Sequence, residues 1–179
     1  SMLDESKNNY YACVYSENGV YGAAFCDIAT GAFNAAVFSG SDAEEAICNE
    51  LGSFSPTELL LGGDAETSDE IKAVASARLG CCMGRSREHQ FDLSLQKNDL
   101  PHIRALDFYG AGKFMGLDLT ARRNLELTET MRTKEKKGSL LGVLDQTKTA
   151  MGGRLLRSWM ERPLLSPAKI GKRLSAVQE

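Results

Sequence analysis

The sequence predicts an α/β protein: a mixed sheet with packed helices in the first half, followed by an all-α helical segment. Between residues 9 and 39, short runs rich in Tyr, Val, Phe and Ala are separated by turn residues, which is typical of strands. Helical and strand-like segments then alternate to about residue 83, as they do in layered α/β domains. After about Leu95 the periodicity is helical, and the glycines lie near the ends of the segments.

The first three strands are expected to form an antiparallel meander. Their sequences are YYACVYS, VYGAAFCDI and GAFNAAVFS. Asn18 and Gly19 separate the first two strands and favour a tight hairpin, because both residue types tolerate positive φ. Thr30 and Gly31 mark the second turn. A mixed sheet that opens with such a meander resembles the ribonuclease H-like fold.

The alternating region begins with a helix that Ser41 or Asp42 can cap. Acidic residues in its first turn suit the positive end of the helix dipole, and we expect Gly52 to end it. The next elements are predicted in this order: a strand at 58–61, a helix capped near Ser68, and a short strand that includes 81–83.

The second half contains four predicted helices. Their positions are 118–128, capped by Asp118 or Thr120; 139–144; a longer helix from near Thr149 to Pro163; and a final helix capped by Ser166. We expect the longer helix to bury one apolar stripe, formed by Met151, Leu155, Leu156 and Trp159. The final helix shows no C-cap signal, and Ser1 before Met2 is typical of tag removal, so we expect a piece of a longer protein.

The charge differs sharply between the two halves. Residues 1–93 hold 5 basic and 15 acidic residues, whereas residues 94–179 hold 16 basic and 9 acidic ones. This asymmetry favours two units, and we place the domains at 1–93 and 94–179. With 42% hydrophobic and 25% charged residues, and no run near the roughly 18 apolar residues of a membrane span, we expect a cytoplasmic protein.

No metal or catalytic constellation is predicted. The five cysteines form no CxxC pair and there are only two histidines, which argues against a zinc site or a disulfide framework. A ribonuclease H-like nuclease needs clustered carboxylates, but Asp27 has no acidic partner on the first strand. We therefore expect no catalytic residue and no metal ligand.

The segment 110–113 (Gly-Ala-Gly-Lys) superficially resembles the end of a phosphate-binding loop. Asp107 stands where the first loop glycine would be, and Phe114 replaces the Ser or Thr that binds magnesium. We expect a glycine-rich turn here and no cofactor-binding residue in this chain.

Basic residues in the second half are candidates for contact with DNA or with another domain. The predicted set is Arg122, Arg123, Lys136, Arg154 and Arg157. Clustered cations attract phosphates, but this region lacks aromatic residues for base stacking, so we favour a solvated helix end and an exposed loop over direct contact with DNA. For Arg154 and Arg157, which lie close to Gly152 and Gly153, we favour an interdomain contact.

Long ordered motifs in the second half resemble the core domain of MutS mismatch-repair proteins. They are LDLTARRNLELTET at 117–130 and LLGVLDQTKTAMGGRLLRSWMERPL at 140–164, preceded by LPHIRAL at 100–106. In the first half, DIATGAF at 27–33 and SPTELLL at 55–61 are similar to the connector domain of the same family. One departure is a short junction, because these proteins carry a longer, mainly helical stretch before the LPHI segment.

The resemblance implies a ribonuclease H-like connector without nuclease activity, joined to the start of the core. In such proteins these parts link mismatch binding to the ATPase. The parent is then expected to dimerise, to bind mismatched double-stranded DNA, to use ATP with magnesium, and to recruit MutL, for which the acidic half offers a docking surface. The alternatives are a ribonuclease H-like nuclease, a nucleic-acid-binding module, or a MutS relative acting in recombination.

Overall fold

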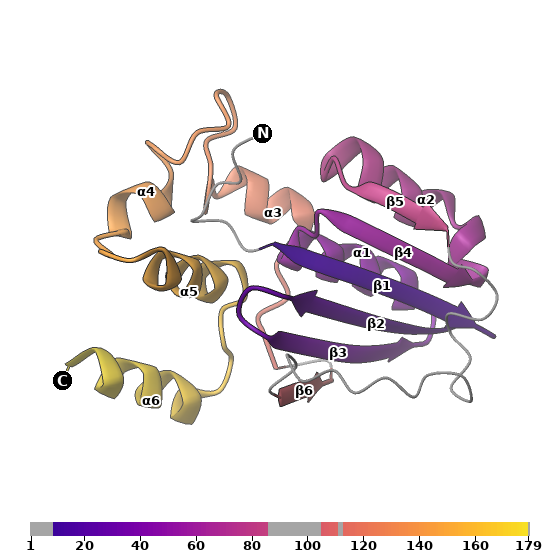
Figure 1. The fold of residues 1–179 in the computed structure, drawn as a ribbon, viewed down its shortest axis with the longest axis horizontal. Coiled ribbons are helices and arrows are strands. Elements are labelled where there is room, and N and C mark those ends of the chain that lie inside the picture. Colours follow the sequence, from indigo (N-terminus) through magenta and orange to yellow (C-terminus); the bar gives the residue numbers. More distant parts are fainter. Residues whose placement is uncertain (1–8, 86–104, 111–112, 179) are drawn as a thin grey trace. The chain divides into compact units, whose positions relative to one another are not determined.

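The computed structural model describes residues 9–85, 105–110 and 113–178. They fall into two compact units, one made of residues 9–110 and the other containing 111–179 (Figure 1). The domain boundary predicted at Leu93 lies outside the described residues. We describe each unit by itself.

The first unit is built on a mixed six-stranded sheet with the order β5-β4-β1-β2-β3-β6. Its strands are β1 (Tyr10–Glu17), β2 (Val20–Asp27), β3 (Ala32–Ser39), β4 (Glu58–Gly63), β5 (Cys82–Arg85) and β6 (Ala105–Tyr109). The first three pair antiparallel, and β4 and β5 extend the β1 edge as parallel strands. The predicted meander and mixed sheet are confirmed.

The hairpin between β1 and β2 follows the predicted turn chemistry. Asn18 and Gly19 both have positive φ, at 52° and 75°, which is the backbone of a two-residue hairpin that matches strand twist. The register then aligns Tyr10 with Asp27 and Glu17 with Val20, so the two strands pair along their whole length.

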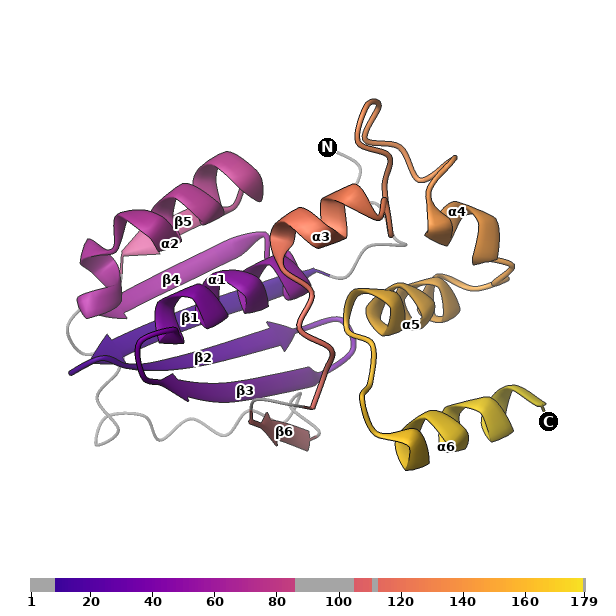
Figure 2. The same cartoon turned by 180° about the vertical axis from the view of Figure 1, so that it is seen from behind.

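Helices lie on one face of this sheet. They are α1 (Ala43–Phe54) and α2 (Asp69–Ala73), the latter continued by a π-helical turn, η2 (Val74–Arg78), and preceded by a short 3₁₀ turn, η1 (Asp64–Thr67). Figure 2 shows α1 in front of the central strands. Alternate strand residues such as Val14 and Phe25 point toward it and are fully buried with Ile47 and Leu51. This layer is the core of the unit.

The expected end of α1 at Gly52 is wrong. The helix continues to Phe54 and ends at Ser55, which has a left-handed φ of 45° before Pro56. Phe54 stacks on Phe25 at 3.9 Å between ring centroids and meets Tyr10 edge-on at 5.0 Å. Burying this ring stabilises the last turn by more than the roughly 1 kcal/mol that glycine costs inside a helix.

β6 corrects the expectation that the chain is helical after about Leu95. Ala105–Tyr109 is a strand that pairs parallel with β3, from Ala32 beside Ala105 to Ala36 beside Tyr109. The Tyr109 hydroxyl donates to the Glu50 carboxylate at 2.6 Å and so ties the end of the strand to α1. Its partner strand lies some seventy residues away in the sequence, and local periodicity carries no information about that pairing.

The second unit is helical, as predicted. Its helices are α3 (Leu119–Asn124), α4 (Leu140–Leu144), α5 (Ala150–Glu161) and α6 (Pro167–Gln178). The side chains of Asp118, Ser139 and Thr149 each accept a hydrogen bond from the backbone N–H three residues later, so all three act as N-caps. A short antiparallel bridge between Phe114 and Leu164 joins the segment before α3 to the segment after α5.

Two expectations for this unit are wrong. α3 ends at Asn124 and not near Thr128, because Glu126 turns to a φ of 46° and its carbonyl accepts from the Leu140 N–H. The predicted buried stripe of α5 is largely open: Met151 is 73% and Leu155 is 52% exposed, while the buried positions are Gly153 and Glu161. α5 therefore packs within this unit through Gly153 and through its last turn, which contains Glu161.

Candidate functional site

The five predicted basic residues all lie in the second unit, where they differ in their contacts and in their exposure. Arg122 and Arg157 meet at Glu161, and Lys136 pairs with Asp145. Arg123 is exposed on α3, and Arg154 is half-buried on α5. No described interaction brings all five together into one surface.

The Glu161 cluster consists of Arg122, Arg157 and Glu161. On α5, Arg157 Nε donates to Glu161 Oε1 at 2.8 Å, one helical turn apart. From α3, Arg122 donates through Nε to the Leu117 carbonyl at 2.9 Å and through its terminal nitrogen to the Glu161 carbonyl. One arginine therefore binds the side chain of Glu161 and the other binds its backbone, which fastens α3 to the end of α5.

Burial dominates the electrostatics of Glu161. Removal from water raises the pKa of its carboxyl, and the nearby charge and hydrogen bond of Arg157 oppose that effect only in part. A guanidinium committed to a buried carboxylate is less available for a phosphate. Within the second unit, Arg122 and Arg157 thus act as internal ties. Sequence reasoning missed Glu161, although its i,i+4 spacing from Arg157 was a usable signal.

Lys136 takes part in a second network. Its Nζ donates to Asp145 Oδ2, while the backbone N–H and the hydroxyl of Thr147 donate to Asp145 Oδ1 at 2.9 and 2.6 Å. These hydrogen bonds favour the ionised carboxylate and lower its pKa from the usual 3.8 to about 2, with the Lys136 hydrogen bond as the largest cause. The network holds the lysine-rich loop against the turn that precedes α5.

Glycines let the helices approach this turn closely. A side chain at Gly142 would collide with the Lys136 carbonyl oxygen, and one at Gly153 would come within 3.3 Å of the Thr147 hydroxyl. Thr149 then caps α5 by accepting from the Gly152 N–H at 3.1 Å. Within the motif at 140–164, Asp145, Thr147, Thr149 and Gly153 thus have a structural explanation, as a turn, a cap and a close contact.

Changing Asp145 to asparagine should abolish a pH dependence of stability. Because the folded-state pKa is depressed, the carboxylate contributes stability that is fully present above the unfolded value of 3.8 and is lost as the pH falls toward about 2. Urea unfolding between those pH values should show a decline in the native protein that Asp145→Asn lacks. A Thr147 amide resonance titrating with a midpoint near 3.8 in the native protein would contradict this account.

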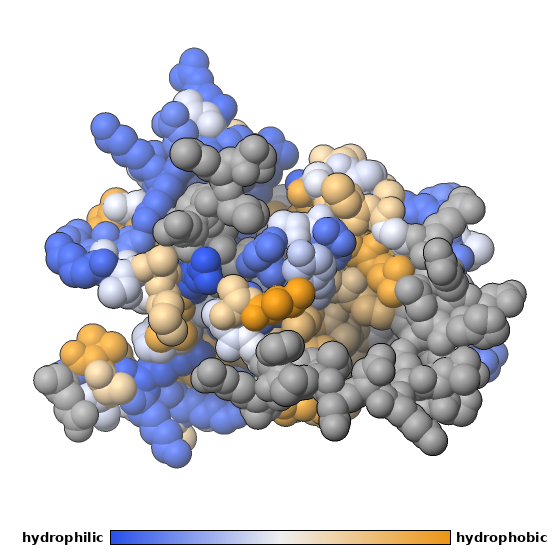
Figure 3. Space-filling model, in the orientation of Figure 1, coloured by the Kyte–Doolittle hydropathy of each residue, from blue (hydrophilic) through white to orange (hydrophobic). Residues whose placement is uncertain are grey.

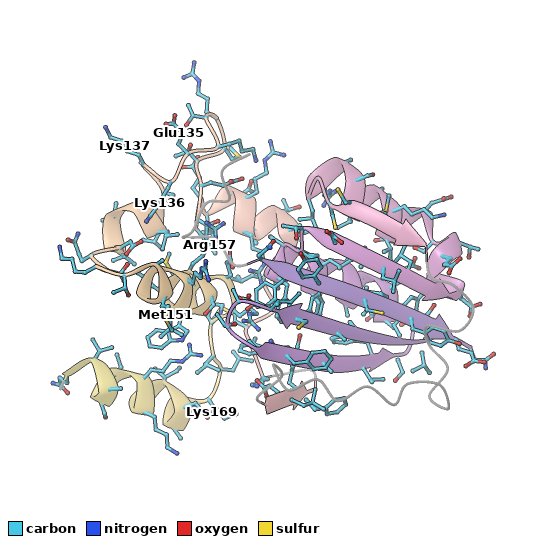
Figure 4. All side chains as sticks on the ribbon, viewed as in Figure 1. Glu135, Lys136, Lys137, Met151, Arg157 and Lys169 are labelled. Atoms are coloured by element: carbon cyan, nitrogen blue, oxygen red, sulfur yellow. The ribbon has the colours of Figure 1, made fainter. Side chains whose placement is uncertain are left out.

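The exposed cations lie mainly on the lysine loop (residues 130–138) and beside it. Thr130 organises this loop, because its N–H donates to the Glu135 carbonyl at 2.9 Å and its carbonyl accepts from the Lys134 N–H at 3.1 Å. Lys134 meets Glu129 at 3.3 Å in an exposed pair, whereas Lys137 extends outward (Figure 4). The exposed cations of the loop region are Arg123, Arg132, Lys134, Lys136 and Lys137.

The described part of the chain shows no groups of three or more metal-ligating side chains. Asp27 is buried and accepts from the Ala29 N–H at 2.9 Å, so it serves the turn after β2. Burial raises the pKa of Cys13 and Cys81 to about 11 and of Cys48 to about 12, which disfavours the reactive thiolate. Residues 111–112 of the phosphate-loop-like segment lie outside the described residues.

Comparison with known proteins identifies two family domains along the chain. The model of MutS domain II matches residues 9–130, and the model of MutS domain III matches residues 120–179. The chain belongs to the MutS family. Curated DNA mismatch repair proteins MutS align with the whole chain: those of Ruminiclostridium cellulolyticum and Acetivibrio thermocellus are 35% identical over 215 residues, and that of Clostridium tetani is 38% identical over 209.

This MutS chain spans about a quarter of those relatives, between 24% and 25% of their length. Its sheet lies in the part that matches domain II, and the Glu161 cluster and the Asp145 network lie within residues 120–179, which match domain III. None of its described helices is long and apolar enough to cross a membrane.

Proposed function

We propose that this chain is a non-catalytic mechanical part of a MutS protein, which links mismatch recognition to ATP hydrolysis elsewhere in the parent. The observation that carries the proposal is the order of the matches: MutS domain II is followed by MutS domain III without interruption from residue 9 to residue 179. The two ion-pair networks support it, because they connect the helices at the start of domain III to one another. Connected helices can transmit a movement of one to the next.

The parent protein is proposed to act in the cytoplasm as a dimer on mismatched double-stranded DNA, with ATP and magnesium bound outside this chain. The chain alone should therefore hydrolyse no ATP. A steady-state assay on the purified chain tests this, with Lys113→Ala as the paired variant. Turnover that the native chain shows and the variant lacks would assign a phosphate site to residues 110–113 and overturn the proposal.

The first unit is proposed to offer a docking surface for MutL. Its helix layer is acidic: Glu45 on α1 and Asp69 and Glu70 on α2 are all exposed. Glu44 is directed inward, where its carboxylate accepts from the Ser68 hydroxyl. Acidic surfaces attract basic partners and raise the rate of encounter, so the contacting surface of MutL should be basic.

Charge reversal tests this surface. Glu45→Lys combined with Glu70→Lys should weaken binding of the full chain to MutL by about tenfold or more and reduce its salt dependence. Glu129→Lys in the second unit is the matched control and should leave affinity unchanged. Equal affinity of all three proteins for MutL, or no binding by the folded native chain, would count against the docking surface.

A direct contact with DNA is the second candidate, and the exposed cations favour it. Since Arg122, Arg157 and Lys136 are engaged internally, the contact would use Arg123, Arg132 and Lys137. Replacing these three by glutamine should lower the slope of log K against log salt by roughly 0.9 for each phosphate that is no longer neutralised. The double variant Lys72→Gln and Arg78→Gln in the first unit is the control. If the slope is unchanged when Arg123, Arg132 and Lys137 are replaced, these three cations do not contact DNA phosphates.

A further inference from the structure

In the second unit, α6 contacts α5 through an arginine that lies on an aromatic ring. The guanidinium carbon of Arg173, on α6, is 4.6 Å from the centroid of the Trp159 ring, on α5. A ring face attracts a cation but carries no net charge. The contact therefore holds the Arg173 side chain in place and leaves its positive charge unneutralised.

The electrostatic surroundings of Arg173 are positive. No described carboxylate forms an ion pair with it. Partial removal from water, and then the nearby positive charge of Arg162, lower the pKa of Arg173. Two guanidinium groups thus lie within range of each other, and an anion that binds beside them relieves their repulsion.

The remainder of α6 adds positive charge next to Arg173. Lys169, Lys172 and Arg173 stand at positions i, i+3 and i+4, which share one side of a helix. Both lysines are exposed, and residues 162–178 contain four basic residues and no acidic one. Figure 3 shows hydrophilic residues gathered over the first turns of α6. An anion that approaches Arg173 is therefore attracted by several cations at once.

The chemistry of this surface suits a phosphate group better than a carboxylate. A carboxylate carries one negative charge, and a single guanidinium can bind both of its oxygens. A terminal phosphate carries a charge of about −1.5 to −2 at pH 7 and has three strongly accepting oxygens. A nucleic-acid strand instead repeats a single charge about every 3.4 Å. In either form, phosphate can contact more than one cation of α6.

We propose that Arg173, Lys169 and Lys172 form a binding site for phosphate groups on α6, and that Trp159 supports the site by holding Arg173 in place. The ligand is a free or terminal phosphate, or a phosphate of a nucleic-acid backbone. The site goes beyond the proposed function, because its residues are different from those of the DNA contact proposed for the lysine loop and its surroundings.

The fluorescence of Trp159 tests the site directly, because Trp159 is the single tryptophan of the chain. The full chain is titrated with inorganic phosphate, and sodium chloride keeps the ionic strength constant. Emission should change and then saturate. Arg173→Gln should weaken phosphate binding by about tenfold or more. Arg173→Lys, which keeps the charge but loses the planar fork of donors, should give an intermediate affinity.

Two controls separate binding from misfolding. Arg132→Gln removes an exposed positive charge from the lysine loop and should leave phosphate affinity unchanged. The second control uses the native protein. Iodide is an anionic quencher that these cations attract, so phosphate should suppress the quenching of Trp159 by iodide. Phosphate should not affect quenching by acrylamide, which is neutral.

A short DNA duplex distinguishes the two sources of phosphate. If the backbone of a nucleic acid is the ligand, the duplex should saturate the Trp159 signal at a concentration at least about tenfold below that of inorganic phosphate, and added salt should weaken it steeply. If free phosphate is the ligand, the duplex should be no more effective per phosphate. The combined replacement of Arg123, Arg132 and Lys137 by glutamine should preserve the Trp159 response, which separates this site from the proposed DNA contact.

Three outcomes would overturn the proposal. In the first, phosphate changes the emission of Trp159 no more than chloride does. In the second, Arg173→Gln responds to phosphate with the affinity of the native chain. In the third, a peptide of glutamates changes the emission at concentrations at which phosphate has no effect, which would assign these cations to the carboxylates of a protein partner.

Discussion

Replacing Gly63 with alanine should destabilise the first unit by about 3 kcal/mol or more, which combines a strained backbone with overpacking. Gly63 has φ 63° and ψ −142°, a conformation that is essentially restricted to glycine. It also lies directly beside β1: a Cβ would collide with the Ser16 carbonyl oxygen and come within 3.2 Å of its carbon. Both atoms are backbone in a paired strand and cannot move aside.

Gly80→Ala is the matched control for this effect. Gly80 has the same φ of 63°, but nothing lies within 4 Å of the position that its Cβ would take. Its replacement should cost only the left-handed backbone penalty of about 1 to 2 kcal/mol. Urea unfolding of the full chain, followed by far-ultraviolet circular dichroism, measures both. Equal losses of stability for the two variants would show that β4 tolerates displacement from β1 at its end.

Removing the Glu161 carboxylate should cost the second unit about 3 kcal/mol, the usual effect of breaking a buried ion pair. In Glu161→Ala, the Arg157 guanidinium loses its acceptor at 2.8 Å while it stays 15% exposed. Glu161→Gln should cost less, because an amide oxygen can still accept from Arg157 and no carboxylate is buried. The single tryptophan, Trp159, lies on the same helix and reports unfolding by its fluorescence.

Glu129→Gln is the control for loss of an ion pair, since Glu129 and Lys134 are 40% and 59% exposed and such a pair is worth about 0 to 1 kcal/mol.

The dependence of stability on pH gives a second measurement of the Glu161 carboxylate. The folded-state pKa of Glu161 is raised, so its contribution is most favourable below the usual 4.5 and declines as the pH rises through the raised value. Glu161→Gln should lack that decline. If stability declines equally with rising pH in Glu161→Gln, the decline is caused by titratable groups other than Glu161.

Elements with a strong local signal were predictable. The Asn18-Gly19 turn has the backbone that its residues favour, and Asp118, Ser139 and Thr149 cap helices whose first residues the sequence places within one or two positions. Caps and tight turns depend on neighbours three or four residues apart, and those are present in any window of sequence. The family resemblance rests on longer ordered motifs, at 27–33, 55–61, 100–106, 117–130 and 140–164, and it is confirmed.

The candidate basic residues were harder to interpret, because the roles of Arg122, Lys136 and Arg157 depend on their partners. Lys136 and Asp145 are nine residues apart and Arg122 and Glu161 are 39 apart. A run of basic residues in the sequence does not show which distant acceptor each of them contacts. In the structure these three cations have partners within the second unit, although Lys136 stays 44% exposed. Arg123 is exposed on α3 and is the first candidate of the predicted set for contact with a partner.

The α/β-then-helical architecture, the antiparallel meander, most of the helix caps and the MutS family could be predicted from the residues alone. Local propensity, periodicity and motif order are sufficient for these properties. Four features became visible only in the folded chain: α1 continues to Phe54, residues 105–109 complete the sheet, the stripe of α5 is largely open, and Glu161 and Asp145 bind the cations. Each of these depends on burial or on pairing between distant residues, and the free energy of such contacts exceeds the local preferences that the sequence displays.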